Sequence, residues 1–272
     1  MYELVIEPGR LERQYWKDLW RYRELFYFLA WRDILIRYKQ TLIGAAWAVI
    51  RPLLTMLVLT VVFGRLAEMP SGGVPYPILV FAGVLPWQFF ATAVAECGNS
   101  LVTNSALISK VYFPRITIPA SSVIAGFVDF LISAGLMILV MVWYQYLPGP
   151  RVFLLPLFVL MAFGTAFGLG LWISALMVRY RDFRFIIPFI VQFGLYISPV
   201  GFTSAVVPER WRFVYSINPM VGVIDGFRWA VLQGSDHLYW PGFVLSAVVM
   251  VLLLCSGVHY FRKTERTFAD II

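Results

Sequence analysis

Two charged side chains lie deep within long apolar segments of the sequence. Arg51 follows Lys39 by 12 residues, about 18 Å along a helix, and Asp129 follows Arg115 by 14 residues, about 21 Å. Ionisable groups at such depth are costly and need a partner or water. The spacing predicts that Arg51 and Asp129 either form an ion pair or face a common aqueous pathway, and a purely structural ion pair is an equal alternative. Glu96 is near the end of its segment, where it can reach water.

Other groups that could do chemistry are isolated. Cys97 and Cys255 occur in separate apolar runs and His237 and His259 are far apart, so none has metal-site or redox spacing. The 272 residues contain no GxxxxGK[ST], HExxH or GxSxG motif, no Rossmann glycine pattern and no paired carboxylates for glycosyl transfer. We therefore expect no catalytic residues, no metal and no cofactor on this chain.

The composition indicates that the charged groups named above lie in a membrane protein. Hydrophobic residues make up 60% of the chain and charged residues 14%, against about 25% charged in soluble domains. Six segments are long and apolar enough to be transmembrane helices: 41–63, 75–97, 116–146, 152–178, 185–204 and 238–261. The fifth is the weakest because it contains Gln192 and two prolines. The fold class expected is an all-α polytopic membrane protein.

Basic residues predict its orientation. Of the 22 Lys and Arg residues, 16 fall in the N-terminal arm 1–40, the second and fourth loops and the tail 262–272. Because cytoplasmic loops carry an excess of Lys and Arg, both termini are expected in the cytoplasm. The net charge of +7 is thus a topology signal, and no nucleic acid partner is expected. Residues 14–30 place Trp16 and Trp20 opposite Lys17 and Arg21, which predicts an amphipathic interface helix; a charged leader that only fixes topology is the alternative.

Two further segments contain breaks. Phe213–Leu232 is apolar but carries polar residues and Asn218-Pro219, so we expect a re-entrant hairpin of two short helices at the outer face, between helices 5 and 6. A surface segment without a gating role is nearly as plausible. In the second loop, Asn104 or Ser105 can cap a short helix over Ala106–Lys110. Gly164 and Gly168 form a GxxxG motif, which indicates close helix packing and is weak evidence for dimerisation.

Five blocks of sequence, in order, resemble a known family. They are WRDILIRYKQTLIGAAWAVIRPLLTMLVLTVVFGRLA (31–67), PYPILVFAGVLPWQFFATAV (75–94), NSALISKVYFPRITIPASSVIAGFVDFLI (104–132), VRYRDFRFIIPFIVQFGLYISPVGF (178–202) and YSINPMVGVIDGFRWAVL (215–232). Together they resemble the permease subunits of ABC-2-type polysaccharide exporters, and most closely those that export O-antigen. The resemblance spans about residues 25–235.

The resemblance implies a homodimeric channel in the bacterial inner membrane, with two separate ATPase subunits that bind ATP and Mg below it. The substrate would be a polysaccharide linked to polyprenyl pyrophosphate. The coupling helix that docks on the ATPase would involve Asn104, Ser105, Leu107, Ile108, Lys110, Tyr112 and Arg115. The outer gate would involve Asn218, Pro219, Asp225 and Arg228.

The substrate implied by this resemblance suggests a ligand for the basic residues that precede the first span. Arg32, Arg37 and Lys39 could recruit the lipid pyrophosphate, because arginine binds phosphate oxygens with two parallel hydrogen bonds. Topological anchoring is the alternative for each residue. Export of another lipid-linked glycan, such as capsule or teichoic acid, or of a lipid or drug, remains open. A membrane-bound glycosyl- or acyltransferase and an ATP-independent channel are the alternatives from other classes.

Overall fold

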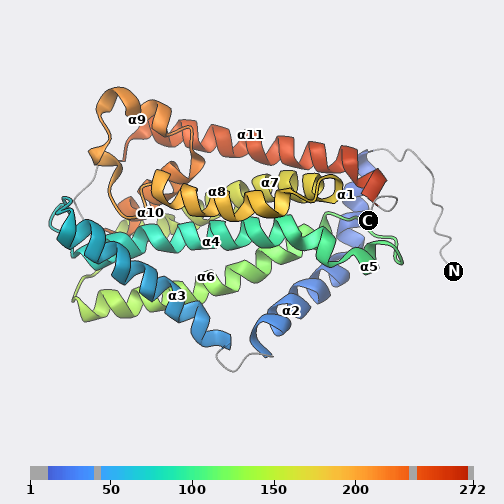
Figure 1. The fold of residues 1–272 in the computed structure, drawn as a ribbon, viewed down its shortest axis with the longest axis horizontal. Coiled ribbons are helices and arrows are strands. Elements are labelled where there is room, and N and C mark those ends of the chain that lie inside the picture. The colour runs from blue at the N-terminus through green and yellow to red at the C-terminus, as the bar shows by residue number, and fades with distance from the viewer. Residues whose placement is uncertain (1–11, 40–43, 233–237, 269–272) are drawn as a thin grey trace.

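The computed structural model describes residues 12–39, 44–232 and 238–268, and these ranges contain helices and no strands (Figure 1). The α-helices are α1 (Glu12–Arg21), α2 (Arg23–Lys39), α3 (Gly44–Leu59), α4 (Tyr76–Thr103), α5 (Ser105–Ile108), α6 (Thr117–Trp143), α7 (Leu155–Arg179), α8 (Phe183–Ile197), α9 (Glu209–Tyr215), α10 (Pro219–Val231) and α11 (Trp240–Thr264). A π-helical stretch, Thr60–Leu66, continues α3, and 3₁₀ turns cover Pro150–Leu154, Ser204–Val206 and Glu265–Thr267.

Several of these helices are apolar and long. Five stretches of the described chain could cross a membrane: Ala46–Leu66, Tyr76–Thr103, Thr117–Trp143, Pro150–Arg179 and Trp240–Thr264. The prediction of an all-helical chain with several apolar spans is confirmed. The expected fifth span, 185–204, is instead the 15-residue helix α8, which is shorter than the roughly 20 residues that a membrane span needs. A sixth crossing therefore stays a prediction.

Helix α4 forms the centre of the bundle. It packs against α6, α7 and α10, and 78% of its most apolar 18-residue stretch is buried (Figure 1). Its sequence is apolar on nearly all sides, which is typical of a helix surrounded by other helices. The peripheral helices α3 and α11 have only 17% of the corresponding 18-residue stretch buried, so most of their apolar surface faces outward.

The expected interface helix 14–30 is two helices that change direction at Tyr22 (Figure 1). Helix α1 crosses one end of the bundle, and α2 runs obliquely along its side. On α2 several large apolar side chains point outward, since Tyr27, Phe28 and Ile36 are more than half exposed, whereas Leu29 is buried. Its arginines Arg32 and Arg37 are only partly exposed and bond to other residues. The predicted single helix is therefore two helices, and the position of either one on the membrane surface stays a prediction.

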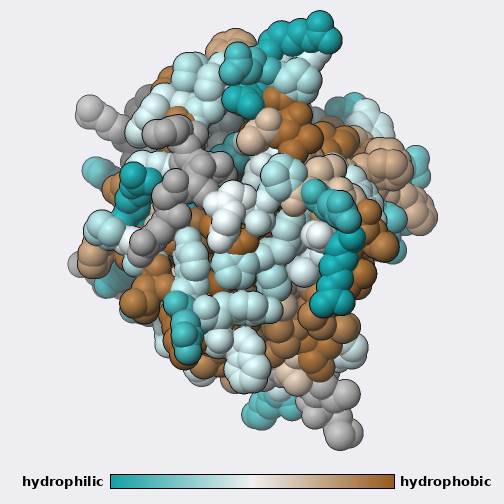
Figure 2. Space-filling model, turned by 90° about the vertical axis from the view of Figure 1, so that its left-hand side faces the viewer, coloured by the Kyte–Doolittle hydropathy of each residue, from teal (hydrophilic) through white to brown (hydrophobic). Residues whose placement is uncertain are grey.

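The end of the molecule that carries α9 faces the viewer in Figure 2. Hydrophilic and intermediate side chains occupy much of this face, and hydrophobic side chains gather along parts of its rim. A polar end with apolar sides is the pattern expected of a bundle that crosses a membrane lengthwise.

The small residues of α7 serve contacts within the chain. A Cβ on Gly168 would lie 2.7 Å from the backbone nitrogen of Leu254, and a Cβ on Gly257 would lie 2.4 Å from the carbonyl oxygen of Gly168. Glycine at both positions therefore lets the backbones of α7 and α11 touch. The GxxxG motif is explained by this packing and supplies no separate evidence for dimerisation.

We predict that Gly168→Ala lowers the stability of the purified protein, because the added Cβ would meet the α11 backbone. The expected loss is about 1–3 kcal/mol, measured as a lower thermal unfolding midpoint in a fixed detergent. Gly135→Ala is the matched control, since a Cβ there meets nothing within 4 Å. Equal midpoints for the two variants would contradict the close approach.

Candidate functional site

Charged side chains of three helices meet beside the bundle centre. Arg37 of α2 donates hydrogen bonds to Glu96 of α4 and to Asp129 of α6, forming an ion pair with each. The hydroxyl of Tyr38 also donates to Asp129. The side chains of Arg37, Glu96 and Asp129 are 22%, 31% and 27% exposed, so each is largely removed from solvent. The three charges thus hold α2 against α4 and α6.

The sequence expectations for this region are only partly met. Asp129 is paired with Arg37, and not with Arg51 as one alternative predicted. Glu96 is also paired, although its position had suggested only contact with water. Among the described residues, the side chain of Arg51 forms no ion pair. Position along each helix predicted the depth of these charges but contained no information on which helices are neighbours.

A cavity of about 570 Å³ lies beside this ion cluster. It is bounded by α2, α3, α4 and α6, and both Arg51 and Asp129 line it. The second alternative, in which the two charges face a common polar space, agrees with this placement. Polar and aromatic side chains complete the walls, among them Trp47, Gln88 and Thr92.

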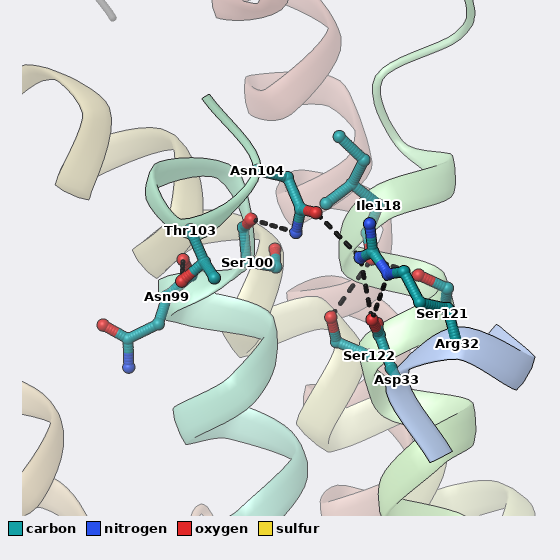
Figure 3. A network of polar contacts seen from close by, with 9 residues as sticks. All are labelled: Arg32, Asp33, Asn99, Ser100, Thr103, Asn104, Ile118, Ser121 and Ser122. Carbon is teal, nitrogen blue, oxygen red and sulfur yellow. Dashed lines mark hydrogen bonds and ion pairs between the residues drawn. The ribbon is translucent and has the colours of Figure 1, made fainter. Parts of the chain in front are cut away.

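A second contact joins α2 to the end of α4 (Figure 3). Arg32 bonds to Asp33 at 2.8 Å and donates to the Asn104 side-chain oxygen at 2.8 Å. Asn104 in turn donates to the carbonyl of Ser100 at 2.9 Å. Asn104 does not cap the next helix with its side chain, and that helix begins at Ser105, one residue earlier than predicted. The side chain of Asn104 therefore connects helices instead of terminating one.

The residues expected to dock on an ATPase divide into two groups. Ile108 is buried in the core, Asn104 is bonded to Arg32, and Ser105 and Leu107 are half-buried. Lys110 and Tyr112 are exposed, and Tyr112 has 55% of its surface accessible. The neighbouring Val111 is 49% exposed and was not predicted to take part.

Arg115 belongs to a separate contact at the same end of the bundle. It donates to the carbonyl of Glu265, whose carboxylate accepts a hydrogen bond from Tyr15 at 3.0 Å. Burial first, and then the nearby Glu265, raise the pKa of the Tyr15 hydroxyl above its usual value, so it stays protonated as a donor. The guanidinium of Arg262 stacks over the Tyr15 ring at 4.6 Å. These contacts join α1, the second loop and the C-terminal helix.

Arg228 lies at the opposite end of the bundle, where it binds backbone carbonyls of several segments. It is 2% exposed and donates to three backbone carbonyls: Leu79 at 3.1 Å, Val200 at 2.7 Å and Phe202 at 2.6 Å. The chain after α8 is thereby held against α4. Gly83 permits this approach, because a Cβ there would lie 2.7 Å from both the Arg228 guanidinium and the Val200 oxygen.

The other residues expected at the outer gate lie around this contact. Asn218 is the N-cap of α10, accepting from the backbone nitrogen of Met220 at 3.1 Å, and it donates to Ser198 at 2.9 Å. Pro219 is the first residue of α10. Asp225 accepts from Ser204 at 2.5 Å. The two short helices α9 and α10 thus meet at Asn218-Pro219, as predicted, and their depth in a membrane stays a prediction.

We predict energetic coupling between Arg37 and Asp129. In a double-mutant cycle, Arg37→Gln and Asp129→Asn should couple by about 0.5–3 kcal/mol in unfolding free energy, since each change removes the same ion pair. The cycle of Arg51→Gln with Asp129→Asn should be additive within about 0.5 kcal/mol. Coupling in the second cycle alone would show that the pairing described here is wrong.

We also predict that Arg228→Met destabilises the fold by at least about 2 kcal/mol, because buried carbonyls would lose a charged donor. Gly83→Ala should destabilise it as well. Arg212→Met is the control: Arg212 also donates to backbone carbonyls, at 2.9 and 3.0 Å, but it is partly exposed and water can replace it. Thermal unfolding of the three purified variants measures the difference, and a larger loss for Arg212→Met would contradict this role of Arg228.

Comparison with known proteins agrees with the resemblance predicted from the sequence. The ABC-2 type transporter model matches residues 24–232. The O-antigen export system permease protein RfbA of Myxococcus xanthus is 27% identical over 259 residues, covering 94% of this chain and 98% of that protein. RfbA of Klebsiella pneumoniae is 26% identical, with 89% and 92% covered. The polysialic acid transport protein KpsM of Escherichia coli is 22% identical, with 86% and 91% covered. Because the family model matches most of its length, the chain belongs to the ABC-2 type transporter family.

Proposed function

We propose that this chain is the channel-forming permease of an ATP-driven exporter that moves lipid-linked polysaccharide, of the O-antigen type, across the bacterial inner membrane. Support comes from the family membership and from relatives named for O-antigen export and polysialic acid transport. A polyprenyl pyrophosphate carrier is the proposed anchor of the glycan. Since the 272 residues contain no P-loop, ATP would be hydrolysed by two separate subunits.

The surface that follows α5 is the observation that carries this proposal. Val111 and Tyr112 are about half exposed beside the charged Lys110, at the end of the bundle where α1 and the C-terminal turn also lie (Figure 1). Helix α5 is fixed behind them, because Ile108 is buried and Asn104 is bonded to Arg32. An apolar, rigidly supported surface at the expected cytoplasmic end is suited to docking an ATPase.

The homodimer is proposed from the outward faces of α3 and α8. Gln192 is exposed on α8 between the exposed rings of Phe189 and Phe193, and Arg51 is exposed on α3. Polar side chains are unfavourable against lipid, so we place these faces against a second copy or the aqueous pathway between copies. The exposed valines of α11, such as Val244 and Val248, suit lipid instead.

The three cations expected to bind pyrophosphate are not equivalent. Arg32 and Arg37 are already bonded to carboxylates, which explains them without a ligand. Lys39 is exposed at the end of α2. A role in pyrophosphate recruitment stays a prediction for all three residues, and Lys39 is the one whose surroundings leave it free to reach a lipid headgroup. The α9–α10 hairpin, held by Asn218 and Arg228, is the proposed outer gate.

The proposal is tested first by mild extraction of the chain from native membranes with mass spectrometry of the bound proteins. We expect a partner with a Walker A motif in a complex of two plus two, and loss of surface polysaccharide when the gene is deleted. Extraction of the chain alone under several mild conditions, with normal surface glycan in the deletion strain, would favour the alternative of an ATP-independent channel.

The docking surface yields a sharper prediction. Tyr112→Asp should reduce the amount of co-purifying ATPase severalfold while leaving the permease folded, because the side chain is exposed and the charge would enter the interface. Tyr144→Asp is the matched control, since Tyr144 is 44% exposed at the other end of α6. Equal recovery of the partner with both variants would exclude this surface as the docking site.

A further inference from the structure

The cavity beside the ion cluster has the size of a ligand site. Its volume of about 570 Å³ lies within the range of roughly 300–1,000 Å³ found for pockets that bind small molecules. It is formed by α2, α3, α4 and α6 of one chain, and its α3 wall carries Arg51, which lies on the face that the proposed homodimer places against a second copy or an aqueous pathway. Charged side chains line it beside apolar ones, and charges among apolar helices require partners, water or a polar ligand.

The charges of the cavity balance. Arg37 and Arg51 supply two positive charges, and Glu96 and Asp129 supply two negative ones. A pyrophosphate group would need an excess of positive charge and would face both carboxylates. A ligand without net charge, with many hydroxyl groups, meets no such repulsion and finds donors and acceptors on the same wall.

The remaining walls suit the faces of a sugar ring. Trp47 and Arg51 are one helical turn apart on α3, and both side chains line the cavity. Trp47 is 53% exposed, and Phe89 and Phe130 lie deeper, at 3% and 7%. Gln88 donates to Thr55 at 3.1 Å and Thr92 lies one turn further along α4, so uncharged polar groups lie beside the rings. Aromatic rings contact the C–H faces of a pyranose while polar groups bind its hydroxyls.

We infer that this cavity is a subsite for one uncharged sugar unit, held between the aromatic side chains and the balanced Arg37–Glu96–Asp129 and Arg51 charges. The inference rests on the proposed function and deepens it, because the sugar would belong to the exported glycan. It also separates sugar binding in the cavity from recruitment of the pyrophosphate, for which the cavity has the wrong charge.

The test is protection of an introduced cysteine in the purified permease. Thr92→Cys in a Cys255→Ala background places a thiol in the cavity, while the native Cys97 is fully buried. We expect a small cationic methanethiosulfonate reagent to label it, and neutral trisaccharides (maltotriose, cellotriose and mannotriose) to slow labelling severalfold in at least one case. Inorganic pyrophosphate should have no such effect, and Trp47→Leu should abolish the protection.

Two further variants make the result decisive. Thr55→Cys, also in the cavity, replaces Thr92→Cys if the latter does not fold, and Ser109→Cys on the exposed second loop should be labelled at the same rate with and without sugar. Rapid labelling that none of the three sugars slows would overturn the inference, as would protection by pyrophosphate alone. The assay contains no ATP or partner, so absence of sugar protection together with normal export would overturn the inference and leave the proposed function intact. Absence of export would contradict the proposed function, and sugar protection would then show only that the cavity binds sugar.

Discussion

The rest of the structure depends on compensating charge among apolar helices. Arg37 is attracted to two carboxylates on different helices, and this places the polar side of α2 inward and its aromatic side outward. Without Glu96 and Asp129, an arginine in this position would be buried without compensation, which is strongly unfavourable. The same contact fixes one wall of the cavity. The position of α2, the shape of the cavity and the access to Arg51 are therefore consequences of one ionic cluster.

Helix α4 connects this cluster to both ends of the molecule. Leu79 near its start accepts from Arg228, Glu96 in its last third pairs with Arg37, and Asn104 at its end accepts from Arg32. From Leu79 to Asn104 is 25 residues, about 38 Å along the helix axis. The apolar length between these points packs against α3, α6, α7, α8 and α10. A displacement of α5 would thus be transmitted along α4, a stiff helix with polar contacts to other segments at three positions along its length.

Hydropathy predicted where the helices lie, because each is long and apolar, but it could not predict which helices are neighbours. Arg51 and Asp129 were expected to pair or to face a common aqueous pathway, and both line one cavity. The partner of Asp129 was missed because Arg37 precedes the first apolar segment and resembles an anchoring charge. The GxxxG at Gly164 was equally ambiguous, since contact within a chain and contact between chains require the same small residues. The inward-facing arginines of α2, spaced five apart, were the available signal for its attachment.

The charge balance of the cavity also bears on how energy could reach the substrate. This chain has no P-loop, so under the proposed function work must enter through the exposed surface after α5. Asn104 lies directly before that helix and is bonded to Arg32, which shares α2 with Arg37. Helix α5 directly follows α4, so its movement acts on α4 through the chain itself and on α2 through the Asn104–Arg32 hydrogen bond. Displacement of the α2 wall would separate Arg37 from Glu96 and Asp129 and leave charges uncompensated, so the ion cluster opposes this movement and keeps that wall of the cavity in place.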